Sequence, residues 1–88
     1  MAQRVAVIGS HSGLHARPAA AFAQAASRAP LPVTLAVEGK EPVAAGSLLG
    51  IMTLGARHGD HVTLTADGDQ AEAVLDELAQ LLERELDA

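Results

Sequence analysis

The spacing of apolar residues along this 88-residue chain alternates between the period of a strand and the period of a helix. A period of two places alternate side chains on one face of a strand, whereas a period of about 3.6 makes a stripe along a helix. Strand-like spacing covers residues 4–8, 33–37, 41–43 and 61–66. Helix-like spacing covers residues 16–29, residues 48–54 and a segment that follows a capping box at Asp69 and Glu72 and reaches Leu86. The predicted order is βαββαβα.

This order predicts an α+β fold of the open-faced sandwich type. Four mostly antiparallel strands covered on one face by three helices would bury every apolar stripe. Residues 61–66 alternate most clearly, with Val62, Leu64 and Ala66 on one face. Pro42 has no N–H to donate, so residues 41–43 are expected at a sheet edge. The length suits one core, and we expect a single domain over residues 1–88.

Composition limits the function. Nearly half of the residues are apolar, yet Phe22 is the only aromatic residue, and there is no cysteine for a disulfide or a thiolate site. The net charge is −5, and eight of the eleven acidic residues follow position 66, so a nucleic-acid binder is not expected. No apolar run approaches the roughly 20 residues that span a bilayer. The first residues also lack a secretory signal, and we expect a cytoplasmic protein without membrane insertion.

Residues 13–20, Gly-Leu-His-Ala-Arg-Pro-Ala-Ala, place a histidine in front of a predicted helix start. If His15 is the N-cap, the backbone N–H groups of Ala16 and Arg17 have no partner within the helix. Helix N-termini favour anions, and the Arg17 side chain adds a positive charge. Pro18 loses no helical hydrogen bond in the first turn. This arrangement suits a phosphoryl group on the His15 ring.

Other interpretations of the histidines remain open at this point. A histidine at a helix start is also common as a cap or a surface residue. His11 and His15 are four residues apart, but no carboxylate or cysteine lies near them to complete a metal site, so we predict no metal. His58 and His61 flank a glycine turn and are expected on an exposed loop and strand.

A second feature is the apolar group formed by Leu48, Leu49, Ile51 and Met52 after Ser47. A short helix cannot bury four large side chains on one side. Two are expected to face the core, either Leu48 with Ile51 or Leu49 with Met52. The others would form an exposed patch for docking a partner, or the segment is a loosely packed connector. Ser47 is a plausible N-cap, and Gly55 ends the helix.

These residues resemble the HPr family, the histidine-containing phosphocarrier proteins of the bacterial phosphoenolpyruvate-dependent sugar phosphotransferase system. The resemblance lies in residues 13–19 and 47–55, and in length and element order. It implies that His15 accepts a phosphoryl group at Nδ1 from phosphorylated enzyme I and passes it to sugar-specific enzyme IIA proteins. It implies that Arg17 contacts this group at transfer. The chain would be a carrier without turnover of its own, and it would need no cofactor.

The resemblance also implies a docking face for both partners, made by Ala16, Ala20, Leu48, Leu49 and Met52. In some members the serine that matches Ser47 is phosphorylated. The alternative function is therefore a regulatory phosphoprotein in nitrogen or catabolite control. It would act mainly through Ser47 and partner binding, with a serine kinase or a transcriptional regulator as partner. No feature predicts an oligomer, so we expect a monomer.

The chain departs from many relatives in its charges. They carry lysines near the first helix and the serine helix, whereas this chain has Gln24, Ser27 and Gly50, with Arg28 as the basic residue of the first helix. Docking is therefore expected to depend more on apolar contact than on charge.

Overall fold

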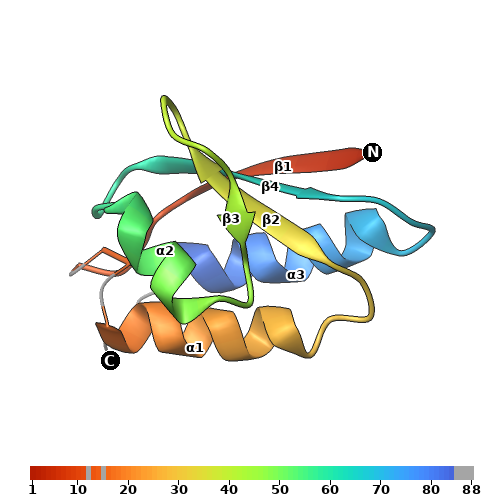
Figure 1. The fold of residues 1–88 in the computed structure, drawn as a ribbon, viewed down its shortest axis with the longest axis horizontal. Helices are drawn as coiled ribbons and strands as arrows, with labels where there is room; N and C mark the ends of the chain where they lie inside the picture. The colour runs from red at the N-terminus through yellow and green to blue at the C-terminus, as the bar shows by residue number, and fades with distance from the viewer. Residues whose placement is uncertain (12, 15, 85–88) are drawn as a thin grey trace.

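The computed structural model describes residues 1–11, 13, 14 and 16–84; Ser12, His15 and residues 85–88 lie outside the described residues. Strands and helices follow one another in the predicted order, βαββαβα (Figure 1). The elements are β1 (Ala2–Val7), α1 (Ala16–Ser27), β2 (Val33–Val37), β3 (Val43–Ala44), α2 (Leu48–Leu54), β4 (His61–Ala66) and α3 (Ala71–Glu83).

The four strands form one sheet in the order β1-β4-β2-β3. All three pairings are antiparallel, so the prediction of a mostly antiparallel sheet is confirmed in its strictest form. The last strand, β4, lies in the middle, where it pairs with β1 over six residues and with β2 over five. Strands that are distant in the sequence therefore meet at the centre of the sheet.

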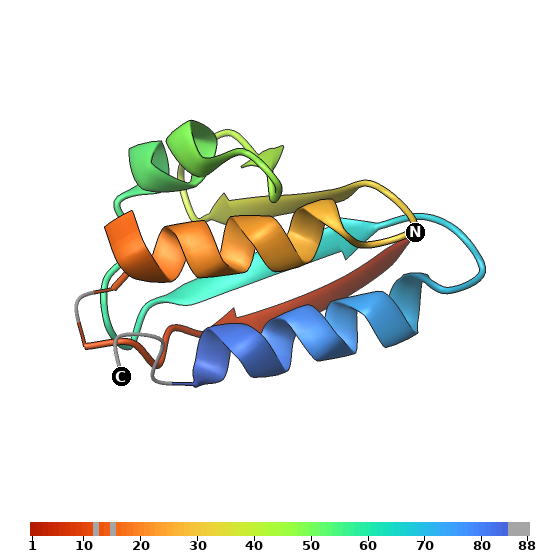
Figure 2. The same cartoon turned by 90° about the horizontal axis from the view of Figure 1, so that it is seen from below.

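The helices pack on one face of this sheet, as predicted (Figure 2). The core between them is aliphatic except for Phe22, which is fully buried. Val62, Leu64 and Ala66 of β4 point into it, and their alternation in the sequence is reproduced in their burial. On the other face, Val5 and Val7 of β1 stay 53% and 38% exposed. The protein is thus the expected open-faced sandwich.

The edge strands differ in detail from the sequence prediction. β1 begins at Ala2 instead of residue 4 and ends at Val7 instead of Ile8. β3 is an edge strand, as expected, but it consists of Val43 and Ala44. Pro42 precedes it, which agrees with the missing N–H of proline.

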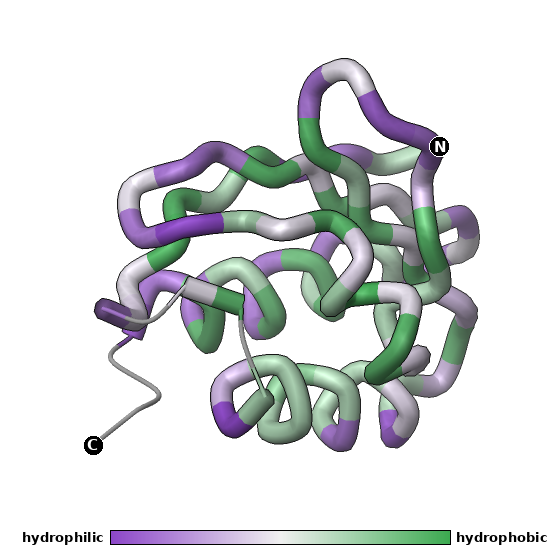
Figure 3. Tube along the Cα trace, turned by 60° about the vertical axis from the view of Figure 1, so that its left-hand side comes forward, coloured by the Kyte–Doolittle hydropathy of each residue, from purple (hydrophilic) through white to green (hydrophobic). Residues whose placement is uncertain are grey.

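Alanine makes up seven of the twelve residues of α1, which explains its pale green colour in Figure 3. Alanine is the best helix former, and its small side chain lets a helix approach a sheet closely. The predicted stripe of Ala19, Phe22, Ala23 and Ala26 is buried. The helix stops at Ser27, two residues early, because the next two N–H groups bond three residues back before Pro30.

In the final helix, α3, the predicted apolar stripe is confirmed, but the predicted start is wrong. Val74, Leu75, Leu78 and Leu82 are buried, and Leu86 lies outside the described residues. The N-cap is Gln70, without a capping side-chain bond, so the capping box predicted at Asp69 and Glu72 is wrong. The reason is that Gly68 turns the chain and its carbonyl accepts the N–H of Ala71 at 3.1 Å, which shifts the start by one residue.

Among the described residues, none of the helices combines the length and the apolar content needed to cross a membrane.

Gly9, just after β1, lies against the backbone at the end of α3. Gly9 donates its N–H to the carbonyl of Leu82 at 2.9 Å. A Cβ atom on Gly9 would collide with the carbonyl oxygen of Glu83 and lie 2.6 Å from its carbonyl carbon. Contacts this short force the backbone apart, because neither side can rotate away.

Gly9→Ala is therefore expected to lower the free energy of unfolding by about 2 kcal/mol, the middle of the range for overpacked sites. The measurement is urea unfolding at equilibrium. Gly46→Ala is the matched control, since a Cβ there would lie 3.5 Å from the nearest atom, and a change within about 0.5 kcal/mol is expected. Equal stability of the two variants would contradict the close contact at Gly9.

Candidate functional site

The loop that leads into α1, residues 9–14, lies at one end of the molecule, beside the end of α3 and the turn at residues 56–60 (Figure 2). Ser10 is fully buried, and its hydroxyl donates to the carbonyl of Arg84 at 3.5 Å. The Ser10 carbonyl accepts the N–H of Gly13 at 2.9 Å, and Leu14 donates to the carbonyl of Ala56 at 2.9 Å. One of these hydrogen bonds closes the loop on itself, and the other two tie it to the end of α3 and to the turn before β4.

Gly13 is required by two independent constraints. Its φ is +70°, a conformation that residues with a Cβ atom rarely adopt. A Cβ there would also lie 2.5 Å from the carbonyl oxygen of Ala56 and 2.8 Å from the Cα of Arg57. Leu14 follows with its side chain buried at 2% exposure. Together they set where the chain leaves the loop and enters position 15.

The helix start predicted at Ala16 is confirmed. The prediction that His15 is the N-cap falls outside the described residues. Ala16 and Arg17 are exposed, whereas Pro18 is buried, so the first turn presents Arg17 at the surface, and its first N–H groups have no partner within the helix. The first turn of α1 contains no acidic residue. The positive end of the helix dipole is therefore not neutralised locally, which favours an anion.

The structure brings further residues to this loop that sequence reasoning did not place there. His58 has its Nδ1 3.3 Å from the carbonyl oxygen of Ser10, and its ring lies 5.1 Å from that of His11. Arg57 contributes an exposed side chain, and its backbone lies against Gly13. These residues are more than 40 positions from the loop, and no motif in the sequence marks them. Only the antiparallel pairing of β1 with β4 brings the turn to the loop.

The positions expected for His58 and His61 agree with the structure. His58 and His61 are exposed, on the turn and at the start of β4 respectively. Within residues 1–84, positions 12 and 15 excepted, no three histidine, cysteine or acidic residues gather closely enough to hold a metal ion.

The second candidate surface is on α2, which packs beside α1 (Figure 1). Ile51 and Leu54 are the buried residues of this helix, so neither pairing predicted from the sequence, Leu48 with Ile51 or Leu49 with Met52, is correct. A three-residue step from Ile51 to Leu54 keeps both on the core side of a short helix. As a consequence, Leu48, Leu49 and Met52 are all exposed, by 39%, 79% and 36%.

We call these three residues the α2 patch. Exposing these three apolar side chains to water is energetically unfavourable, and contiguous apolar patches on a protein surface often mark interaction sites. Of the other docking residues implied by the resemblance, Ala16 is exposed and Ala20 is half-buried, both at the start of α1. The two helices therefore carry all five residues predicted for docking.

Ser47 is the N-cap of α2, as the sequence predicts. Its backbone is extended, with φ −100° and ψ 109°, and its Oγ accepts the N–H of Gly50 at 3.1 Å. Gly55 ends the helix in the left-handed conformation, with φ +64°. The hydroxyl of Ser47 is half-buried and already used in the fold.

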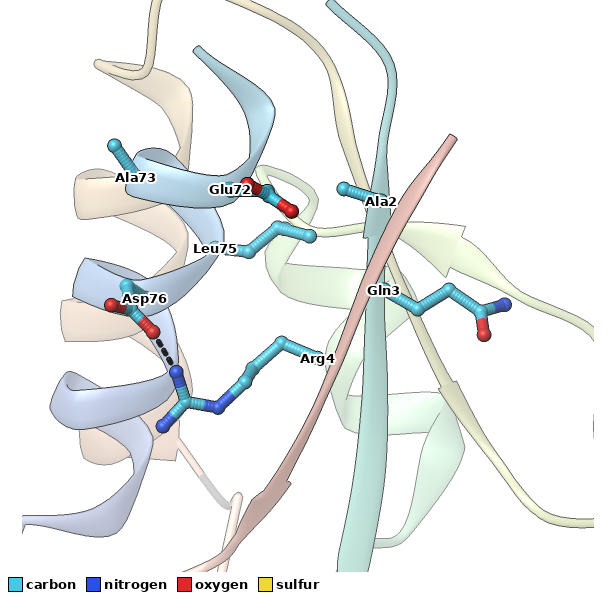
Figure 4. Close-up of a pocket in the computed structure, with 7 residues that line it drawn as sticks. All are labelled: Ala2, Gln3, Arg4, Glu72, Ala73, Leu75 and Asp76. Carbon is cyan, nitrogen blue, oxygen red and sulfur yellow. Dashed lines mark ion pairs between the residues drawn. The ribbon is translucent and has the colours of Figure 1, made fainter.

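A separate recess of about 350 Å³ lies between β1 and α3 (Figure 4). Arg4 spans it and forms an ion pair with Asp76. None of the predicted site residues lines this recess. The recess is therefore separate from the candidate site, which consists of the loop, the start of α1 and α2.

Comparison with known proteins agrees with this geometry. A family model described as the PTS HPr component phosphorylation site matches residues 2–84. The phosphocarrier protein HPr of Streptomyces coelicolor is 44% identical over 82 residues, which cover 93% of this chain and 88% of that protein.

Solved structures show the same fold. HPr from Thermoanaerobacter tengcongensis has a TM-score of 0.88 at 38% identity and covers 100% of this chain and 98% of its own. Crh, a Bacillus subtilis catabolite repression protein described as a dimer with a swapping domain, has a TM-score of 0.73 at 38% identity, with 98% of both chains covered.

The capping role of Ser47 generates a prediction. Ser47→Ala removes the acceptor for the Gly50 N–H and is expected to lower the free energy of unfolding by about 1 kcal/mol. Ser47→Asp keeps an acceptor and adds a favourable charge at the helix start, so it should retain most of the stability. Urea unfolding of both variants measures this difference. Equal destabilisation by the two substitutions would contradict the cap.

Proposed function

Because the chain belongs to the HPr family of phosphotransferase-system phosphocarriers, we propose that it carries a phosphoryl group on His15 Nδ1. The donor is phosphorylated enzyme I, and the acceptors are sugar-specific enzyme IIA proteins. One observation carries the proposal. The residue before position 15, Leu14, is buried, and the residues after it, Ala16 and Arg17, are exposed at the first turn of α1, whose first N–H groups have no partner within the helix.

The chemistry requires little from this protein beyond position and charge. The lone pair of Nδ1 forms a bond to phosphorus while the N–P bond of the phosphohistidine on enzyme I breaks. The same exchange then runs toward enzyme IIA. The N–H groups of Ala16 and Arg17 and the Arg17 guanidinium stabilise the negative oxygens during both transfers. In this role the chain is a protein substrate of its partners and has no turnover of its own.

Docking follows from the same surface. The α2 patch and Ala16 and Ala20 lie on neighbouring helices at the end that carries the loop. A partner seated there also faces the exposed first turn of α1. Because both partners use this face in the proposal, they bind in turn and not together.

A second function is regulation through Ser47, in nitrogen or catabolite control. It is favoured by the likeness to Crh, a catabolite repression protein, over 98% of the chain. Its partners would be a serine kinase or a transcriptional regulator. Location in the cytoplasm and a monomeric state remain predictions, the latter because Crh is a dimer with the same fold.

The carrier function predicts acid-labile labelling at His15. Wild-type protein incubated with enzyme I and ³²P-labelled phosphoenolpyruvate should take up label that is stable in base and lost in acid. His15→Ala should take up none, because it lacks the accepting nitrogen. The matched control is His61→Ala, which removes an exposed histidine on β4 and should be labelled like wild type.

Label retained by His15→Ala would place the accepting residue elsewhere. Absence of label in the wild type, with enzyme I shown to phosphorylate itself, would instead favour the regulatory function.

The docking proposal predicts a specific kinetic effect of the α2 patch. Leu49→Ala is expected to raise the KM of enzyme I for this protein about tenfold, as exposed apolar anchors at interfaces do. The kcat should change little, since the phosphoryl site is untouched. Val5→Ala is the control, because Val5 is an exposed apolar residue on the open face of the sheet. If Leu49→Ala and Val5→Ala have the same KM, whether raised or equal to that of the wild type, docking on α2 is contradicted.

A further inference from the structure

Few side chains of α2 are buried against the rest of the protein. Of its seven residues, Ile51 and Leu54 are buried, and the side chains of the α2 patch face solvent. Burial of these two aliphatic side chains contributes about 1.5–3 kcal/mol each, but the hydrophobic effect has no direction and does not by itself set the orientation of a helix. The orientation of α2 therefore depends on what holds its two ends.

The N-terminal end is held by Ser47, and the C-terminal end is held from outside the helix. The last carbonyl groups of a helix lack intrahelical partners. The Nζ of Lys40 donates to the carbonyl of Leu54 at 3.0 Å and to that of Thr53 at 3.3 Å. The last turn of α2 has no basic residue of its own. Lys40 supplies the cation that favours a helix C-terminus from the turn after β2.

Lys40 bonds to the α2 carbonyls although two glutamates lie near it in the sequence. Glu38 and Glu41 belong to the same exposed segment, yet among the described residues neither forms an ion pair with Lys40. The ammonium group instead bonds to the two helix carbonyls. If Lys40 only kept the turn soluble, its ammonium group would point into solvent and would not contact α2.

We propose that Lys40 is a positioning residue for partner docking. It ties the C-terminal end of α2 to the turn after β2 and so fixes how Leu49 and Met52 face a partner. This inference rests on the proposed docking function and deepens it. An ammonium group has three hydrogens, and the two carbonyls use two of them. The third hydrogen remains for solvent or for a carboxylate of the partner.

The test uses Lys40→Met, which keeps the length of the stem and removes the charge, and Lys40→Arg, which restores a donor. Lys40→Met is expected to raise the KM of enzyme I for this protein about three- to fivefold, with kcat within about twofold of wild type. Lys40→Arg should recover most of the wild-type KM. Amide exchange at Gly55, whose N–H bonds to Met52, should be faster by a similar factor in Lys40→Met.

Arg4→Met is the matched control. It also removes one positive charge and one side-chain contact, the ion pair with Asp76 at the recess between β1 and α3 (Figure 4). Its KM should equal that of wild type at a temperature well below unfolding. If Arg4→Met raises the KM as much as Lys40→Met does, the effect of Lys40 comes from protein stability or net charge, and the positioning role is wrong.

Two further outcomes separate this inference from the proposed function. If wild type is not phosphorylated at all, the carrier function fails, while amide exchange still reports whether Lys40 holds α2. If Lys40→Met has wild-type KM and wild-type exchange, the positioning role is wrong and the carrier function stands.

Discussion

Burial of aliphatic side chains between the sheet and the two long helices is the interaction on which the structure depends. Phe22, Leu35, Leu64 and Leu75 come from four different elements and are almost completely removed from water. Each such side chain contributes about 1.5–3 kcal/mol relative to exposure. The described residues form one hydrophobic core, between the sheet and the helices. The functional segments therefore pack at the edge of this core. The loop before α1 and the whole of α2 are attached in this way.

The two attachments differ in kind. The loop is held by backbone contacts that need close approach, and Gly9 and Gly13 are where a Cβ atom would prevent it. Backbone atoms have few degrees of freedom, so the loop is held rigidly at Gly9 and Gly13. That rigidity suits a site in which one ring nitrogen must meet an incoming phosphoryl group in line. The buried hydroxyl of Ser10 extends the same network to the end of α3.

The attachment of α2 relies on few side chains. Ile51 and Leu54 provide burial, and one polar group holds each end, Ser47 at the start and Lys40 at the finish. A weakly held element is among the first to move or open in a folded protein. For a docking surface that meets two different partners in turn, this is an advantage, because small adjustments of the α2 patch have a low cost. The same weakness makes the orientation of the patch sensitive to single substitutions.

The sequence by itself determined the local features of this protein. Apolar periodicity predicted the order of elements and the stripes of α1 and α3, and the motif around position 15 predicted the family. It missed the buried pair on α2, the start of α3 and the contacts of Lys40 and His58. Burial on a seven-residue helix depends on where that helix lies, and periodicity cannot report this. His58 reaches the loop only because β4 pairs with β1, and Lys40 reaches the end of α2 because that helix packs beside β2 and β3; tertiary packing alone decides both arrangements.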